Sequence, residues 1–207
     1  MPTLKRYKSN INGEITVDIN NGFPTILVDG IIQSGPQMGY LWDEAFDKLV
    51  NGKIVRSILV LGFGTGSIMA SIDTHFPHCH VTGIEIDPVM IDICKEYFPT
   101  HFINATIVRE DALKYVAKLA GKGRYLPRPD RFDLIIVDCY VGSHEEMGTK
   151  KLSFLKSLKR LGDCVIYNQL FISNNQKELV KISFLKDLDI LFDVKALKLP
   201  HNIIIAF

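Results

Sequence analysis

Three glycines follow a run of branched apolar residues in SILVLGFGTGS, residues 57–67. Gly62, Gly64 and Gly66 lack a Cβ atom, so the backbone there can adopt positive φ and a ligand can approach it closely. A helix that starts just after such a turn also offers free backbone N–H groups. The spacing therefore predicts a ligand-binding turn, with a merely tight strand-to-helix turn as the alternative.

Acidic residues stand at the ends of the predicted strands that follow. Glu85 ends the strand in HVTGIEIDP, about 20 residues beyond the glycines, where a carboxylate can accept hydrogen bonds from both ribose hydroxyls of a nucleoside. In VREDALKYV, Glu110 and Asp111 follow the next strand, and Asp111 can accept from an adenine amine, cap the following helix, or do both. Asp138 ends FDLIIVD. Asp133 opens that strand at the opposite end of the sheet and is predicted to be structural.

The glycine turn and the three acids Glu85, Asp111 and Asp138 are expected at one edge of one sheet, because ligands of open α/β sheets bind beyond the carboxyl ends of the strands. This convergence predicts a nucleoside site. The turn contains no basic residue for a diphosphate. An acidic cleft suits a cationic ligand, such as a sulfonium, an amine, or both.

Strand and helix patterns alternate along the chain and must position these residues. The apolar strands are expected at 57–61, 80–84, 105–108, 133–138 and 163–167. The helices are expected at 40–50, 66–75, 88–97, 111–119, 147–160 and 175–186, with Asp87 as the N-cap of the third. Such alternation predicts an α/β fold with a parallel sheet and helices on both faces.

The two ends of the chain depart from this alternation. EITVDI (14–19) and TILVDG (25–30) predict a β-hairpin in an N-terminal segment, residues 1–39, ahead of a Rossmann-like domain over 40–207. The last two strands meet at residues 199–202, a link too short for a crossover, so one antiparallel strand must enter the sheet. We therefore expect a mostly parallel seven-stranded sheet.

Composition limits the partners and the location. The 207 residues carry 24 basic and 23 acidic side chains, a net charge of +1, which gives no reason to expect nucleic acid or a membrane surface. No apolar run could span a bilayer, the N-terminus does not resemble a signal peptide, and four unpaired cysteines favour buried thiols in the cytoplasm. The six histidines show no metal-ligand spacing, so no metal site is predicted. The stretch 121–131 is expected to be an exposed connector or a docking loop.

The order of these motifs resembles the class I S-adenosylmethionine-dependent transferases, and most closely the spermidine/spermine synthase family. EIDPVMIDICKEYFP is close to the segment that follows the glycine turn in that family. ILVDGIIQS supplies Gln33, and LWDEAF supplies Trp42 and Glu44, at matching distances. The likeness covers about residues 12–170.

The resemblance implies S-adenosylmethionine, or its decarboxylated form, as co-substrate and a small amine as acceptor of an aminopropyl or methyl group. It implies that Asp138 helps to deprotonate the amine and that Trp42 lines the substrate pocket. Tyr140, which follows Asp138, could line the pocket by stacking or could simply pack. The resemblance also allows a homodimer. The implied nucleoside-binding residues are Gln33, Gly62, Gly64, Gly66, Glu85, Ile86, Glu110, Asp111, Ala112 and Asp138.

Departures from the family pattern leave alternatives open. The family has a second acid in the element that reads DCYVG here, and Val141 stands in its place. The glycine turn also differs from GGGxGG, and the C-terminal half is shorter than is typical. The alternatives are a methyltransferase acting on an unidentified small molecule and a non-catalytic binding or interaction module. A dinucleotide oxidoreductase is the weakest of them, because no catalytic set follows the glycines. Asn168 and Gln169 end the fifth predicted strand, where they could face the acceptor or merely cap the strand.

Overall fold

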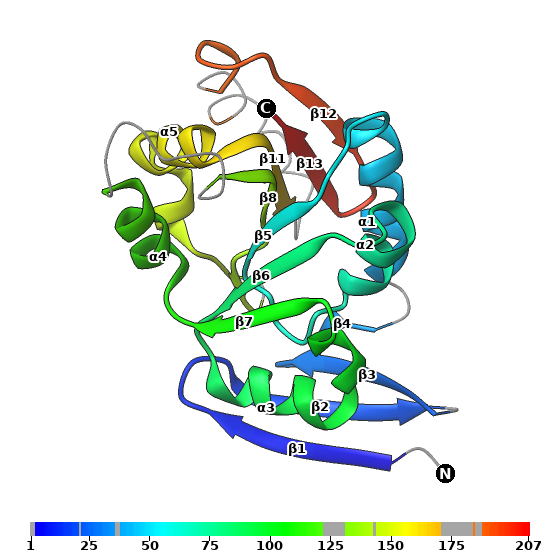
Figure 1. Ribbon diagram of the computed structural model, residues 1–207. Helices are drawn as coiled ribbons and strands as arrows, with labels where there is room; N and C mark the ends of the chain where they lie inside the picture. Colours follow the sequence, from blue (N-terminus) through cyan, green and yellow to red (C-terminus); the bar gives the residue numbers. More distant parts are fainter. Residues whose placement is uncertain are drawn as a thin grey trace.

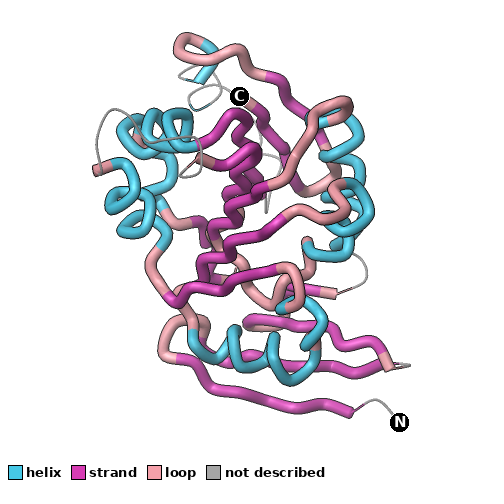
Figure 2. Tube along the Cα trace, in the orientation of Figure 1, coloured by secondary structure: helices cyan, strands magenta, loops and turns pink. Residues whose placement is uncertain are grey.

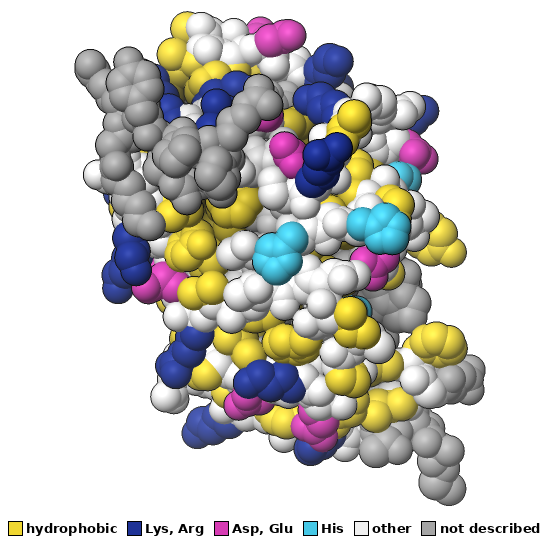
Figure 3. Space-filling model, in the orientation of Figure 1, with side chains coloured by type: hydrophobic (Ala, Val, Ile, Leu, Met, Phe, Trp, Pro, Cys, Tyr) yellow, Lys and Arg dark blue, Asp and Glu magenta, His cyan; other side chains and the backbone are white. Residues whose placement is uncertain are grey.

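The computed structural model describes residues 3–20, 22–35, 38–121, 131–142, 144–170, 184 and 188–207. A seven-stranded sheet forms the centre of the molecule, and a separate four-stranded antiparallel sheet lies below it in Figure 1. Figure 3 shows one face, on which basic and acidic side chains are interspersed among apolar ones. No described helix is long and apolar enough to cross a membrane.

The central sheet has the strand order β12-β13-β11-β8-β5-β6-β7. Its strands are β5 Ser57–Leu61, β6 His80–Glu85, β7 Ala105–Arg109, β8 Phe132–Val137, β11 Gly162–Leu170, β12 Lys195–Lys198 and β13 Asn202–Ala206. β13 is antiparallel to both of its neighbours, and the other pairings are parallel. The predicted Rossmann-like sheet with one antiparallel strand is therefore confirmed.

Helices cover both faces of this sheet, as Figures 1 and 2 show. The helices are α1 Gly39–Ala45, the π-helical turn η2 Phe46–Val50, α2 Met69–His75, α3 Pro88–Tyr97, the 3₁₀ turn η3 Pro99–Phe102, α4 Ala112–Ala120, the 3₁₀ turn η5 Met147–Lys150 and α5 Leu152–Leu161. Ile58 and Val60 of β5 belong to the core with α1 and α2, whereas Leu59 and Leu61 belong to the core with α4 and α5. A strand buried on both faces must be apolar throughout, which explains the run SILVL.

The N-terminal sheet contains more than the predicted hairpin. The expected strands correspond to β2 Gly13–Asn20 and β3 Phe23–Val28, and the sheet adds β1 Thr3–Ser9 and β4 Ile31–Ser34 at its edges. Its apolar face packs on Met90 and Ile93 of α3. The division into segments 1–39 and 40–207 stays a prediction.

A buried carboxylate joins the N-terminal sheet to α3. Asp87 Oδ1 accepts from the Val89 N–H at 2.8 Å, so Asp87 is the predicted N-cap of α3. Its Oδ2 accepts from Ser9 Oγ at 2.5 Å and Asn12 Nδ2 at 2.6 Å. Because Asp87 is fully buried, these donors replace the water that its charge would otherwise need.

Other expectations differ in detail. The helix predicted at 40–50 is α1 followed by η2, the one at 66–75 begins at Met69, and the one at 147–160 is η5 followed by α5. A two-stranded hairpin, β9 Tyr140–Val141 and β10 His144–Glu145, precedes η5. The helix expected at 175–186 and the loop at 121–131 lie almost wholly outside the described residues. The four cysteines are free thiols, and Cys79, Cys94 and Cys164 are buried.

Candidate active site

The register of the sheet aligns four residues along one edge. Leu61 of β5 pairs with Ile84 of β6 and with Val137 of β8, so Gly62, Glu85 and Asp138 follow at the same level. Tyr167 of β11 pairs with Val137, which places Asn168 beside Asp138. The predicted convergence at the carboxyl ends of the strands is therefore present.

Gly62 is required by a close approach of two backbones. Its φ is +84°, and a Cβ atom there would collide with the carbonyl of Asp138. The N–H groups of Gly62 and Phe63 both donate to the Ile84 carbonyl, at 3.0 and 2.9 Å. These bonds hold the turn after β5 against the end of β6.

The other two glycines have different roles. The Gly64 N–H donates to Glu85 Oε2 at 2.7 Å. The turn therefore holds the side chain of Glu85, the predicted ribose-binding acid, by a backbone hydrogen bond. A Cβ on Gly66, whose φ is +77°, would lie 2.7 Å from the Phe63 ring. Gly66 lines neither of the cavities described below, although its neighbours Thr65 and Ser67 line the larger one, so its contact with the ligand stays a prediction. It makes room for Phe63.

Glu85 is buried and fixed. Only 7% of it is exposed, and its Oε1 accepts from the Asp87 N–H at 2.8 Å while Oε2 accepts from Gly64. Burial raises the pKa of Glu85 above its usual value, and the two backbone donors partly counter that rise. The carboxylate is thus held in one orientation beside the turn.

A cavity of about 240 Å³ lies on one side of Glu85. Ile86, Glu110, Asp111 and Ala112, all predicted nucleoside-binding residues, line it. The Asp111 side chain also caps α4, because its Oδ1 accepts from the Lys114 N–H at 2.8 Å. The cap is confirmed, and the contact with adenine stays a prediction.

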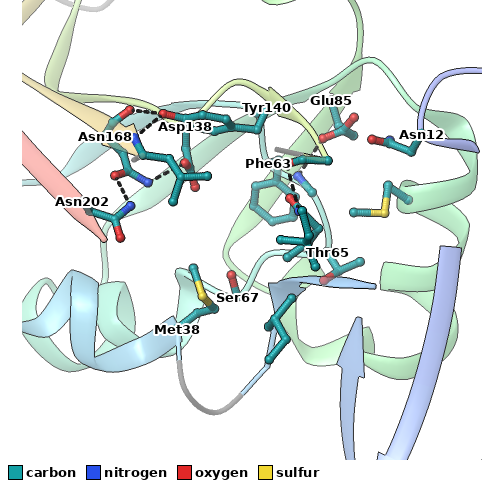
Figure 4. Close-up of a pocket in the computed structure, with 18 of the residues that line it drawn as sticks. Asn12, Met38, Phe63, Thr65, Ser67, Glu85, Asp138, Tyr140, Asn168 and Asn202 are labelled. Atoms are coloured by element: carbon teal, nitrogen blue, oxygen red, sulfur yellow. Dashed lines mark hydrogen bonds between the residues drawn. The ribbon is translucent and has the colours of Figure 1, made fainter. Parts of the chain in front are cut away.

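A larger cavity of about 480 Å³ lies on the other side, and Figure 4 shows it in close-up. Gly62, Glu85 and Tyr140 line both cavities, so the two meet at the glycine turn. Gln33 and Asp138 line the larger one. Gln33 Nε2 donates to the Gly142 carbonyl at 3.0 Å, which ties β4 to the end of β9.

Asp138 stands in the larger cavity. Burial raises its pKa to about 6, and a hydrogen bond from Asn168 Nδ2 to its Oδ1, 2.8 Å long, opposes that rise. The Tyr140 hydroxyl donates to the Asn168 carbonyl and accepts from the Leu170 N–H, each at 2.8 Å. Tyr140 therefore joins the chain after Asp138 to the end of β11.

Some expected residues do not reach the larger cavity. Trp42 is 1% exposed, packs in the hydrophobic core near Phe46 and does not line the larger cavity, so its expected contact with the substrate stays a prediction. Glu44 is exposed and lines neither cavity. Val141 lines the smaller cavity. Asp133 is structural, as predicted, and accepts from the N–H groups of Arg56 and Ser57 at 2.8 and 2.9 Å.

The structure adds lining residues that sequence reasoning did not select. Asn12 comes from the turn after β1, His201 comes from the turn before β13, and Asn202 is the first residue of β13. The antiparallel strand was expected, and its first residue had to lie near the carboxyl ends of the parallel strands. That was the available signal for Asn202. Gln169 is buried and does not line the cavity, whereas Asn168 does.

The arrangement can hold a nucleoside and a second small molecule side by side. Acidic groups in the smaller cavity match the donors of a nucleoside, and Asp138 can exchange a proton in the larger one. Among the described residues, no group of three or more His, Cys, Asp or Glu side chains could hold a metal ion.

Comparison with known proteins gives a consistent picture. A family model described as the spermine/spermidine synthase domain matches residues 45–194. The polyamine aminopropyltransferase of Buchnera aphidicola from Schizaphis graminum is 29% identical over 157 residues, covering 72% of this chain and 50% of that protein. The chain thus spans about half the length of the curated relatives it matches.

Solved structures share the fold. A probable spermidine synthase from Corynebacterium glutamicum superposes over 100% of this chain and 80% of its own, with a TM-score of 0.75 and 16% identity. A spermidine synthase in complex with the transition-state analogue AdoDATO gives a TM-score of 0.70 at 14% identity, covering 98% of this chain and 71% of its own.

Proposed function

Since this chain belongs to the spermine/spermidine synthase family, we propose that it transfers an aminopropyl group from decarboxylated S-adenosylmethionine to a small amine. The observation that carries the proposal is the meeting of two cavities at Gly62, Glu85 and Tyr140, with Asp138 in the larger one. The nucleoside occupies the smaller cavity, the acceptor occupies the larger one, and the sulfonium lies between them.

The proposed residue roles follow from this placement. Glu85 accepts hydrogen bonds from the ribose hydroxyls, Asp111 with Glu110 faces the adenine amine, and Ile86 and Ala112 cover the base. Gly62 and Gly64 let the sulfonium approach the backbone. Gln33 and Tyr140 form walls near the reacting atoms.

The proposed reaction is an in-line displacement. The amine nitrogen forms a bond to the aminopropyl carbon attached to sulfur, and that carbon–sulfur bond breaks with its electron pair going to sulfur. Methylthioadenosine leaves as a neutral thioether, and the proton lost by the amine passes to Asp138. Alignment of donor and acceptor supplies much of the rate, and Asp138 contributes as a general base.

The test is an assay of methylthioadenosine release from decarboxylated S-adenosylmethionine with putrescine and with simple monoamines. Asp138→Asn should leave the affinity for methylthioadenosine unchanged and slow turnover about a hundredfold or more. Because a base must be ionised and burial raises the Asp138 pKa to about 6, kcat/KM should fall as pH drops below about 6.

Other outcomes identify the alternatives. Methyl transfer from S-adenosylmethionine to an amine, with no aminopropyl transfer, would replace the proposal by a methyltransferase. Binding of methylthioadenosine without turnover of any amine would leave a non-catalytic binding module, which Val141 favours because it stands in place of the family's second acid. Binding of a nicotinamide dinucleotide in preference to these ligands would indicate an oxidoreductase.

We also propose that the partners are small molecules rather than nucleic acid or a membrane, and that the chain acts in the cytoplasm. A homodimer is part of the same proposal. Light scattering of the purified protein decides the oligomeric state, and a monomeric mass would contradict the dimer.

A further inference from the structure

Three polar side chains form a chain of hydrogen bonds along the wall of the larger cavity (Figure 4). Asn202 Nδ2 donates to Asn168 Oδ1 at 2.8 Å, and Asn168 Nδ2 donates to Asp138 Oδ1 at 2.8 Å. The three residues come from neighbouring strands, at the start of β13, near the end of β11 and just after β8.

The two asparagine side chains in this chain of hydrogen bonds are buried. Asn168 is 4% exposed and Asn202 is 8% exposed. A buried amide group has lost its hydration, so each hydrogen bond that it makes here replaces one with water. The pairing of Leu170 with Asn202 sets the register of β13, and that register brings Asn202 to Asn168.

The direction of the chain of bonds matters because an amide has a donor end and an acceptor end. If Asn168 were turned over, its carbonyl oxygen would face Asp138, and only a protonated Asp138 could bond to it. The Asn202 donor occupies Asn168 Oδ1 and so supports the orientation in which the Asn168 NH₂ faces Asp138, because turning Asn168 alone would bring two NH₂ groups together.

We propose that Asn202 is a positioning residue that acts through Asn168 to hold Asp138 as an oriented carboxylate. Asn168 engages Oδ1, and among the described residues no hydrogen bond is recorded to Oδ2, which remains for the acceptor amine. The catalytic consequence rests on the proposed function, whereas the effect on Asp138 itself does not.

Other ionisable groups near Asp138 are part of its environment. Glu85 from β6, Tyr140 from β9 and His201 from the turn before β13 line the same cavity, and Cys139 is the next residue in the chain. Of these groups, none has a recorded hydrogen bond to the Asp138 carboxylate among the described residues, so Asn168 is the donor specific to its ionised form.

The experiment is a double-mutant cycle with Asn168→Leu and Asn202→Leu, which remove each amide without adding charge. The readout is the titration of the Asp138 side-chain carboxyl carbon by NMR, beside the pH profile of kcat/KM. Loss of the donor in Asn168→Leu should raise the Asp138 pKa by about one unit, and Asn202→Leu should raise it by about half a unit.

The double variant should titrate like Asn168→Leu alone, because Asn202 has no route to Asp138 once Asn168 is gone. Full additivity of the two shifts, or an unchanged titration in Asn202→Leu, would overturn the proposal. Asn202→Ala replaces Asn202→Leu if the leucine does not fit. Asn104→Leu, at an exposed position before β7, is the matched control and should leave the titration unchanged.

The NMR titration separates this inference from the proposed function. If no amine is turned over but the Asp138 pKa shifts as stated, the positioning role stands and the aminopropyl transfer fails. Methylthioadenosine affinity should be unchanged in all variants, since neither amide lines the smaller cavity.

Discussion

Glu85 and Asp138 are two carboxylates in one cleft, and burial raises the pKa of both. They differ in their donors. Both oxygens of Glu85 accept from backbone N–H groups that cannot turn away, whereas Asp138 accepts from one side-chain amide. Glu85 is therefore suited to hold a ligand, and Asp138 is suited to exchange a proton.

Glu85→Gln should weaken methylthioadenosine binding by about 10- to 100-fold, measured by titration calorimetry. The amide would direct an NH₂ group at the N–H of Gly64 or Asp87, and hydrogen bonds to a charged acceptor contribute about 1.5–3 kcal/mol. Asp92→Asn on the exposed side of α3 should leave the affinity unchanged. An unaltered affinity in Glu85→Gln would mean that the ribose lies elsewhere.

At the scale of elements, the glycine turn and the Asp87 contacts fix the parts that carry the site. The turn after β5 needs both a left-handed backbone and space beside β8 at Gly62. Asp87 fixes the start of α3 and, through Ser9 and Asn12, the end of β1.

Gly62→Ala should destabilise the protein more than Gly52→Ala does. Both glycines have similar φ, +84° and +79°, so both variants incur the left-handed strain of about 1–2 kcal/mol. Only at Gly62 does a Cβ meet other backbone atoms, those of Asp138 and Cys139 after β8, whereas at Gly52 nothing lies within 4 Å. Urea unfolding measures the difference. Equal losses would show that the backbone of Asp138 can move away.

Asn12→Ala should lower the free energy of unfolding by about 1–3 kcal/mol, because the buried Asp87 carboxylate loses a donor. Asn10→Ala, in the same turn but exposed, is the matched control and should change stability by less than about 0.5 kcal/mol. A loss of similar size in both variants would contradict the role of Asp87 as the contact between sheet and helix.

Sequence patterns predicted the strand ends well, because apolar runs that stop at Glu85 and Asp138 mark both the strand and its carboxyl edge. The family likeness placed Trp42 at the substrate, whereas the structure buries it in the core. Its spacing to Ala45, Phe46 and Leu49 is that of a helix face turned to the core, and burial followed that periodicity.

Asn202 was missed because a sequence does not give the order of strands within a sheet. β1 was missed because TLKRYKS is too polar to predict a strand.

At the scale of the whole molecule, the larger cavity has walls from both sheets. Asn12, Ile31 and Gln33 come from the N-terminal sheet, whereas Asp138 and Asn168 come from the central one. A ligand that fills this space contacts both sheets at once, and its binding free energy stabilises them together.

Methylthioadenosine together with putrescine, which occupies the larger cavity in the proposed placement, should therefore slow amide hydrogen exchange in β4 as well as in the turn at 62–66, measured by mass spectrometry. Uridine, which lacks the adenine amine and the thioether, should have no such effect. Protection confined to the central sheet would show that the ligand does not reach the N-terminal wall.

The two cavities also differ in the sequence separation of the residues that line them. Apart from Ile11, the described walls of the smaller one come from residues 62–146, whereas the larger one needs residues from Asn12 to Asn202. Contacts between distant segments form late, since long loops must close first. We expect a refolding chain to acquire the proposed nucleoside pocket before the proposed acceptor pocket, and so to pass through a stage that binds the donor without consuming it.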